Sequence, residues 1–284
     1  MCELLGMSAN VPSDICFSFT GLMQRGGRTG PHRDGWGITF HEDNGCRTFK
    51  DSAPCYDSPI AKLLQAYPIK SRAVIGHIRQ ANRGPVALEN THPFTREQWR
   101  GFWTFAHNGQ LTDYQALQQP GKHLPVGDTD SETAFCWLLN ELDRKYPHKP
   151  ADMQAMFRYL GELCLQLQNF GIINILLSDG DYVFCFCSSS LHWITRRAPF
   201  GEAQLIDEDV AINFHHETTP NDVVTVIATL PLTANEQWHK MEPGSYLLFH
   251  HGECVDSVAG NASPNAAPAN ENPCPTTLLR HNRP

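Results

Sequence analysis

The second residue of the chain is a cysteine, and a thiol at that position can carry two reactive groups. Cysteine is small enough for an aminopeptidase to remove the preceding Met1, which would leave Cys2 with a free α-amine beside its thiol. An α-amine has a pKa of about 7.7–8.0 and a thiol one of about 8.5, so the amine can take the thiol proton near neutral pH. A terminal nucleophile that uses its own amine is a known mode of covalent catalysis. Cysteine can also stand at position two by chance, so Cys2 predicts catalysis only together with other groups.

An arginine follows an apolar run where a predicted strand ends. Arg79 lies in the segment GHIRQAN, residues 76–82. A guanidinium at the mouth of a sheet can bind a carboxylate through two parallel hydrogen bonds. The alternative is an arginine that extends into solvent from the strand end, which is the more common fate of a single arginine. Arg79 is therefore a candidate for binding a carboxylate.

Asparagine and glycine follow the predicted strand 103–107. The Asn108 side-chain amide and the Gly109 backbone N–H could both donate to an oxyanion, and glycine lets a carbonyl group approach the backbone closely. Such donors stabilise a tetrahedral intermediate, and each typically contributes about 2.7–4 kcal/mol. Because Asn-Gly is also a common turn sequence, a simple turn is the alternative interpretation.

An acidic run, GDTDSE at 127–132, precedes a predicted helix. Thr129 and Glu132 have the spacing of a capping box, which would satisfy the first free amides of that helix. The run holds one acidic residue more than capping requires. That residue could hold an ammonium group of a ligand, and capping alone is the alternative.

Strands and helices have to position these groups, and the hydrophobic pattern predicts both. Apolar runs bounded by turn residues predict strands at 3–7, 37–41, 73–79, 103–107, 172–177, 182–187, 223–228 and 245–250. Helical spacing predicts helices over about 59–66, 131–145 and 153–169. The Asp-Gly pair in 178–181 predicts a hairpin turn. Strands in two groups, with helices between and after them, indicate sheets covered by helices.

The composition excludes several classes of protein. The chain has 284 residues with 22 basic and 30 acidic side chains, for a net charge of −8. Nucleic-acid-binding domains are usually strongly basic, so nucleic acid is not an expected partner. No apolar stretch reaches 18 residues, which excludes a membrane-spanning helix, so no membrane partner is expected. The N-terminus lacks the regions of a secretory signal, and we expect a cytoplasmic protein with reduced thiols.

One folded domain is predicted over residues 2–258, and residues 259–284 have the composition of a mobile surface tail rich in Pro, Asn and Ala.

No metal site is predicted, because the 14 histidines show no helical i, i+4 pairing of the hydrolytic zinc type. Cys185 and Cys187 would share one face of a strand, where core packing is favoured over metal ligation.

Five motifs occur in a particular order along the chain. They are Cys2, DGWG at 34–37, HIR at 77–79, HNG at 107–109 and TDSE at 129–132. In this order and at these intervals they resemble the class II glutamine amidotransferases, which are N-terminal nucleophile (Ntn) hydrolases. The resemblance covers Cys2 to about His251 and implies an α+β fold, a four-layer αββα sandwich of two mainly antiparallel sheets.

The resemblance also implies roles for single residues. Cys2 would attack the γ-carboxamide of glutamine and form a γ-glutamyl thioester, which water hydrolyses to glutamate. Arg79 matches the residue that binds the α-carboxylate, and Asp130 matches the one that pairs with the α-ammonium. Asn108 and Gly109 match the oxyanion hole. His92 matches a histidine of the glutamine-binding loop, and no metal or organic cofactor is implied.

Three functional hypotheses follow. The first is an amidotransferase or glutaminase that cleaves glutamine, with any ammonia acceptor on a separate synthase, since the tail leaves no room for a second active site. The second is a γ-glutamyl amidohydrolase that acts on a larger γ-glutamyl metabolite, because the run CELLG at 2–6 is similar to a stand-alone bacterial subgroup containing both kinds. The third is a glutamine-sensing module without catalysis, against which the full set of candidate groups argues.

Overall fold

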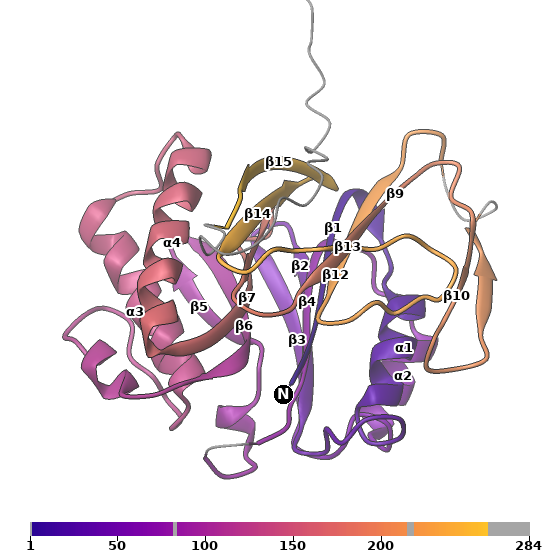
Figure 1. The fold of residues 1–284 in the computed structure, drawn as a ribbon, viewed down its shortest axis with the longest axis horizontal. Helices are drawn as coiled ribbons and strands as arrows, with labels where there is room; N and C mark the ends of the chain where they lie inside the picture. The colour runs from indigo at the N-terminus through magenta and orange to yellow at the C-terminus, as the bar shows by residue number, and fades with distance from the viewer. Residues whose placement is uncertain (1, 82–83, 215–218, 261–284) are drawn as a thin grey trace, which may run out of the picture.

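The protein is described here by a computed structural model that covers residues 2–81, 84–214 and 219–260, and its elements form four layers (Figure 1). In hydrogen-bonded order, the first sheet consists of β13 (His239–Lys240), β9 (His192–Arg197), β12 (Val223–Ala228), β1 (Glu3–Ser13), β4 (Ser71–Ile78), β2 (Trp36–Glu42) and β3 (Gly45–Asp51). The second sheet consists of β15 (Glu253–Val258), β14 (Ser245–His250), β8 (Tyr182–Cys187), β7 (Gly171–Ser178), β6 (Gly101–Leu111) and β5 (Phe94–Gln98). Neighbouring strands pair antiparallel in both sheets.

Helices cover the outer face of each sheet (Figure 1). The first sheet carries α1 (Cys16–Arg25) and α2 (Pro59–Ala66), and the second carries α3 (Asp130–Lys145) and α4 (Met153–Leu167). Among the described residues, the remaining elements are three short 3₁₀ helices and a small two-stranded pair: η1 (Leu88–Asn90), η2 (Tyr114–Leu117), η3 (Gln168–Phe170), β10 (Glu202–Gln204) and β11 (Ala211–Asn213).

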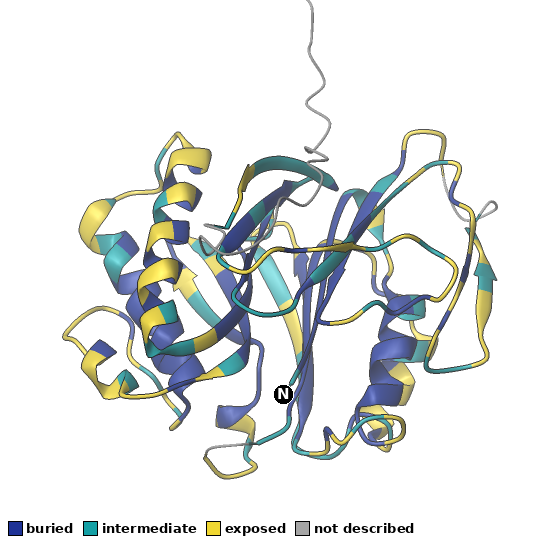
Figure 2. Ribbon diagram, in the orientation of Figure 1, coloured by how far each residue is buried: buried dark blue, intermediate teal, exposed yellow. Residues whose placement is uncertain are grey.

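Three apolar clusters fill the spaces between the four layers, and the strands that separate them are buried (Figure 2). Successive side chains of a strand point to opposite faces, so Leu5 joins the cluster under α1 while Leu4 joins the cluster between the sheets. Under α3, the Phe135 ring stacks on Phe105 of β6 with centroids 4.9 Å apart. The predicted four-layer α+β sandwich is therefore confirmed.

The sequence explains where the helices begin. Ser58, Thr129 and Asp152 each accept a hydrogen bond from the backbone N–H three residues later, which caps α2, α3 and α4. The second half of the predicted capping box is wrong. The Glu132 carboxylate accepts from the Gly127 N–H at 2.7 Å and pairs with Arg96 instead of reaching back to its own cap.

All of the predicted strands and helices are present, but several bounds differ. β1 extends to Ser13 and β6 extends to Leu111. Asn108 and Gly109 therefore lie inside β6, so the predicted strand end at residue 107 is wrong, and so is the alternative of a simple turn.

β4 ends at Ile78, so Arg79 is the first residue after the strand rather than its last. α4 ends at Leu167 and continues as the 3₁₀ helix η3. The sequence analysis does not predict helix α1 or the strands β3, β5, β9, β10, β11, β13 and β15. The hairpin turn at 178–181 is confirmed, with Gly180 at a φ of 98°.

The division into a domain over 2–258 and a tail over 259–284 stays a prediction, and all of the tail beyond residue 260 lies outside the described residues. Within the described ranges, no helix is long and apolar enough to cross a bilayer. The cytoplasmic location also stays a prediction.

Candidate active site

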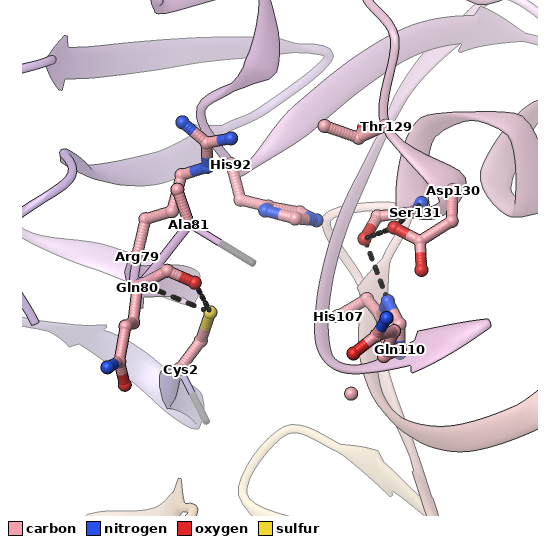
Figure 3. Close-up of a pocket in the computed structure, with 11 residues that line it drawn as sticks. Cys2, Arg79, Gln80, Ala81, His92, His107, Gln110, Thr129, Asp130 and Ser131 are labelled. Atoms are coloured by element: carbon pink, nitrogen blue, oxygen red, sulfur yellow. Dashed lines mark hydrogen bonds between the residues drawn. The ribbon is translucent and has the colours of Figure 1, made fainter. Parts of the chain in front are cut away.

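Four elements converge on one cavity: the start of β1, the end of β4, strand β6 and the first turn of α3. The cavity is lined by Cys2, Arg79, Gln80, Ala81, His92, His107, Gly109, Gln110, Thr129, Asp130 and Ser131. Figure 3 shows the Cys2 and Gln80 side of the cavity facing the Asp130 and Gln110 side. Its volume of about 40 Å³ is close to that of one water molecule, so the lining side chains must move to admit an amino acid.

The Cys2 thiol lies against the backbone of Gln80. The Gln80 N–H donates to Cys2 Sγ at 3.3 Å, and Sγ lies 3.6 Å from the Gln80 carbonyl oxygen (Figure 3). Burial raises the pKa of the thiol, and the Gln80 N–H and the Arg79 charge offset part of that rise. The thiol is therefore protonated near neutral pH and needs a base before it can act as a nucleophile.

Arg79 is held at the end of β4 by the run that contains Asp34. The Arg79 N–H donates to the Gly35 carbonyl at 2.8 Å, and the Arg79 carbonyl accepts from the Asp34 N–H at 3.1 Å. The Asp34 carboxylate accepts from the Ala81 N–H at 2.7 Å. Gly35 has a φ of 110°, which a residue with a Cβ rarely adopts. The DGWG motif thus anchors the segment that carries Arg79.

Arg79 is 4% exposed as a residue, and its guanidinium donates to the Pro85 carbonyl at 3.0 Å. Burial lowers its pKa, although the Cys2 thiol and Asp34 act in the opposite direction. A guanidinium stays charged in proteins, so this side of the cavity carries a positive charge.

Asp130 supplies a negative charge on the opposite side. Its Oδ2 accepts from the Leu111 N–H at 2.7 Å and its Oδ1 from the Ser131 N–H at 2.9 Å. These bonds connect the first turn of α3 to the end of β6 and fix the direction of the carboxylate. Thr129 caps the helix through the Glu132 N–H, and Asp130 accepts from a second amide of the first turn, that of Ser131.

His107, the first residue of the HNG motif and one to which the sequence analysis assigns no role, joins the same two elements. Its Nε2 lies 3.1 Å from the Ile172 carbonyl oxygen and its Nδ1 lies 2.8 Å from Ser131 Oγ. A carbonyl can only accept, so Nε2 carries the proton and Nδ1 accepts from the serine hydroxyl. Burial lowers the pKa of His107 and keeps the ring neutral.

Gly109 and Asn108 are neighbours in β6, but only Gly109 lines the cavity. A Cβ at Gly109 would lie 1.9 Å from the Ile172 carbonyl oxygen, so only glycine fits. The Asn108 amide Nδ2 donates to Thr229 Oγ1 at 3.3 Å, and the same oxygen accepts from the Leu4 N–H at 2.9 Å. Through Thr229, Asn108 is therefore connected to Leu4 of β1, which follows Cys2 by two residues.

His92 lines the cavity and is 4% exposed. Its ring centroid lies 4.2 Å from that of His77 and 4.4 Å from that of Phe94. Neither ring nitrogen of His92 has a hydrogen-bond partner among the described residues. Burial, with a smaller contribution from His77, holds its pKa well below the usual value, so the ring is neutral.

The cavity thus unites Cys2, Arg79, Gly109, Asp130 and His92, with Asn108 beside them. Gln80, His107, Ser131 and Thr229 add contacts that sequence reasoning missed. In the part of the chain that the structure describes, no three His, Cys, Asp or Glu side chains gather as metal ligands would.

Comparison with known proteins gives the family. The model for "Glutamine amidotransferases class-II" matches residues 1–273. The chain is 66% identical to "Putative glutamine amidotransferase YafJ" of Escherichia coli (strain K12) over 90% of this chain and all of that protein. A crystal structure of a "predicted glutamine amidotransferase" from Pseudomonas aeruginosa PA01 shares 53% identity with a TM-score of 0.73, covering 90% of this chain and 100% of that one.

A more distant structure supports the fold alone. The B. subtilis glutamine phosphoribosylpyrophosphate amidotransferase superposes with a TM-score of 0.60 at 16% identity, over 91% of this chain and 49% of that one. The four-layer sandwich is thus the Ntn-type fold of amidotransferases. Together with the family match, these findings show that the chain belongs to the class II glutamine amidotransferases.

Proposed function

We propose that this protein hydrolyses the γ-carboxamide of glutamine through a γ-glutamyl thioester on Cys2, after Met1 has been removed. The observation that carries the proposal is that a thiol, a guanidinium and a carboxylate line one cavity, at Cys2, Arg79 and Asp130. Glutamine has a negative α-carboxylate, a positive α-ammonium and the amide that reacts. Each of the two charged groups needs a partner of opposite charge, because a buried charge without a partner costs several kcal/mol.

In the proposed reaction, the α-amine of Cys2 takes the thiol proton while the sulfur attacks the amide carbon. A C–S bond forms and the carbonyl oxygen becomes an oxyanion. When the oxyanion collapses, the C–N bond breaks, and the proton held by the amine goes to the departing nitrogen to give ammonia. Water then attacks the thioester carbon, the C–S bond breaks, and glutamate and the free thiol are released.

The surrounding groups have distinct proposed roles. Arg79 binds the α-carboxylate and Asp130 pairs with the α-ammonium. The Asn108 amide has two N–H groups, and since one donates to Thr229, the other is available to the oxyanion together with the Gly109 N–H. His92 belongs to the substrate-binding surface, because a buried imidazole without a hydrogen bond gains a partner when a polar substrate enters.

The lining must move for either candidate substrate. Glutamine, whose leaving group is ammonia, needs a smaller opening than a larger γ-glutamyl amide, and it is therefore the substrate we propose first. The ammonia is released or passed to an acceptor protein on a separate chain. The charged pair and the thiol in one lining argue against a sensor that has lost catalysis.

The test is glutamate release by protein whose loss of Met1 has been verified by mass spectrometry. We expect turnover of glutamine to exceed that of γ-glutamylcysteine and glutathione, and acid quenching to trap a glutamyl adduct on the N-terminal peptide. Faster turnover of the two larger amides would favour the amidohydrolase alternative. No turnover of any of the three, or active enzyme that retains Met1, would contradict the proposal.

A further inference from the structure

Thr229 follows strand β12 directly and contacts both the strand of the nucleophile and the proposed oxyanion donor. Its hydroxyl oxygen lies 2.9 Å from the Leu4 nitrogen and 3.3 Å from Asn108 Nδ2. Thr229 is 5% exposed and does not line the cavity, so it does not touch the substrate. We propose that Thr229 is a positioning residue that aligns the Asn108 amide with the Cys2 end of β1, an inference that rests on the proposed function.

The contact with β1 occurs where the strand ladder ends. The paired register of β1 and β12 ends at Leu5 and Ala228. One residue further, the Leu4 N–H donates to the Thr229 hydroxyl rather than to a backbone carbonyl, while the Thr229 N–H donates to the Leu4 carbonyl at 3.3 Å. Both polar backbone groups of Leu4 therefore depend on Thr229, two residues before the chain reaches the Cys2 thiol.

Thr229 is itself held in place. Its carbonyl accepts from the Ser190 hydroxyl at 3.2 Å and lies 2.8 Å from His192 Nδ1. Because these bonds hold the Thr229 backbone in place, its hydroxyl can hold the Leu4 N–H and the Asn108 amide in a fixed position relative to each other.

The backbone of Asn108 is also fixed, by a different residue. The Asn174 amide donates to the Asn108 carbonyl at 2.9 Å, and Asn174 Oδ1 accepts from the N–H groups of Ser188, Ser189 and Ser190. With its backbone held, Asn108 keeps only side-chain torsions free. The bond to Thr229 removes that freedom, because directing one N–H of a planar amide also fixes the direction of the other.

This geometry predicts an effect on the chemical step rather than on binding. A misaligned oxyanion donor stabilises the transition state less but leaves the groups that hold the substrate, Arg79 and Asp130, unchanged. Displacing a catalytic group by about 1 Å can cost on the order of 100-fold in rate.

The experiment compares Thr229→Val, which keeps the shape but removes the hydroxyl, with Thr229→Ser, which keeps the hydroxyl. We expect Thr229→Val to lower kcat for glutamine about 10- to 100-fold with KM within about 3-fold, and Thr229→Ser to restore kcat to within about 3-fold of wild type. Hydrogen exchange of the Leu4 amide should be faster in the Val variant and near wild type in the Ser variant.

Thr225→Val is the matched control. Thr225 is a fully buried threonine on β12, and its hydroxyl donates to the Gly252 carbonyl at 2.8 Å, away from Asn108. We expect its kcat to match wild type.

The results of these experiments distinguish a failure of the proposed role of Thr229 from a failure of the proposed function. Wild-type kcat in Thr229→Val, equal losses in the Val and Ser variants, or an equal loss in Thr225→Val would overturn the role of Thr229 alone. Wild-type protein that hydrolyses no γ-glutamyl amide would instead overturn the proposed function on which that role rests.

Discussion

Two of the cavities that border helix α3 each contain a cysteine. The Cys2 cavity, of about 40 Å³, lies at the first turn of the helix. The second, of about 510 Å³, lies further along it, between Thr133, Cys136, Trp137 and Asn140 on the helix and residues 117–125. If volume marked an active site, the second cavity would be chosen.

Two polar residues of the larger cavity, Asn140 and His123, are hydrogen-bonded to each other. Asn140 Nδ2 donates to the His123 carbonyl at 2.9 Å, and the His123 N–H donates to Asn140 Oδ1 at 2.9 Å. Burial raises the pKa of Cys136 to about 11. Among the described residues, no Arg, Lys, Asp or Glu lines this cavity.

The Cys2 cavity differs in the charges on its two sides. Arg79 and Asp130 face it from different elements, and a backbone N–H donates to its thiol. The comparison teaches that the site is marked by opposite charges and hydrogen-bond donors around a nucleophile, and that empty volume is a poor guide. Four predictions test this, from the largest effect to the smallest.

The largest effect is expected from Cys2→Ala. Removing the nucleophile should lower kcat for glutamine on the order of 10⁴-fold or more, because no thioester can form. Glutamine binding, measured by calorimetry, should be largely intact, since Arg79 and Asp130 remain. Alanine is also small enough for removal of Met1, which mass spectrometry can verify. Substantial turnover by this variant would mean that the thiol of the smaller cavity is not the nucleophile.

Arg79→Lys should act on binding. Lysine keeps the charge but cannot form two parallel hydrogen bonds to a carboxylate, so KM for glutamine should rise about 10- to 100-fold while kcat changes less. Arg72→Lys is the matched control, because Arg72 lies on the same strand β4 but is exposed. An unchanged KM in the Arg79 variant would remove this guanidinium from carboxylate binding.

The buried histidines beside Cys2 should make stability depend on pH. Burial holds the pKa values of His77 and His92 well below 6.5, whereas in the unfolded chain each takes a proton near pH 6.5. Between the folded-state and unfolded-state pKa values of these histidines, the unfolded chain binds more protons than the folded one. Their contribution to the free energy of unfolding is therefore fully present above pH 6.5 and is lost as the pH drops. Each histidine contributes up to about 1.4 kcal/mol per pH unit.

Urea unfolding of wild type, His92→Phe and His148→Asn between pH 7.5 and 5 measures this dependence. We expect the Phe variant, whose ring suits the neighbouring Phe94 and Phe105, to have a shallower dependence. The variant at exposed His148 should follow wild type. Identical slopes in all three would contradict the assignment of a neutral buried His92.

The sequence predicted the buried part of the fold better than its edges. The central strands are continuous apolar runs because both of their faces are covered, and β8, β12 and β14 begin and end where predicted. The edge strands β3, β5 and β15 were missed, as was β9 beside the edge strand β13, because one side of each faces solvent and charged residues interrupt the apolar run, as in FTREQ at 94–98. Helix α1 was missed because its sequence, CFSFTGLMQR, mixes aromatic and β-branched residues with glycine.

The candidate site was predictable where a side chain of distinctive chemistry follows a strand, as with Arg79, or precedes a helix, as with Asp130. The contacts of Gln80 and Thr229 were not predictable. Gln80 acts on the thiol through its backbone, which every residue type supplies. Thr229 lies 225 residues from Leu4, and the contact depends on the register of β1 and β12.

The smallest effect is expected from Cys136→Ala. If the larger cavity is only a packing defect beside α3, kcat and KM for glutamine should stay within about 2-fold of wild type, and the free energy of unfolding should fall by about 1 kcal/mol, as is usual for a buried point change. Steady-state kinetics and urea unfolding measure the two quantities on the same sample. The thiol is 2% exposed and lies on the same helix as Asp130, so an effect on activity would have to pass along α3. A loss of kcat beyond about 10-fold with normal stability would break the contrast between the two cavities, because it would show that the larger one takes part in the chemistry of the smaller.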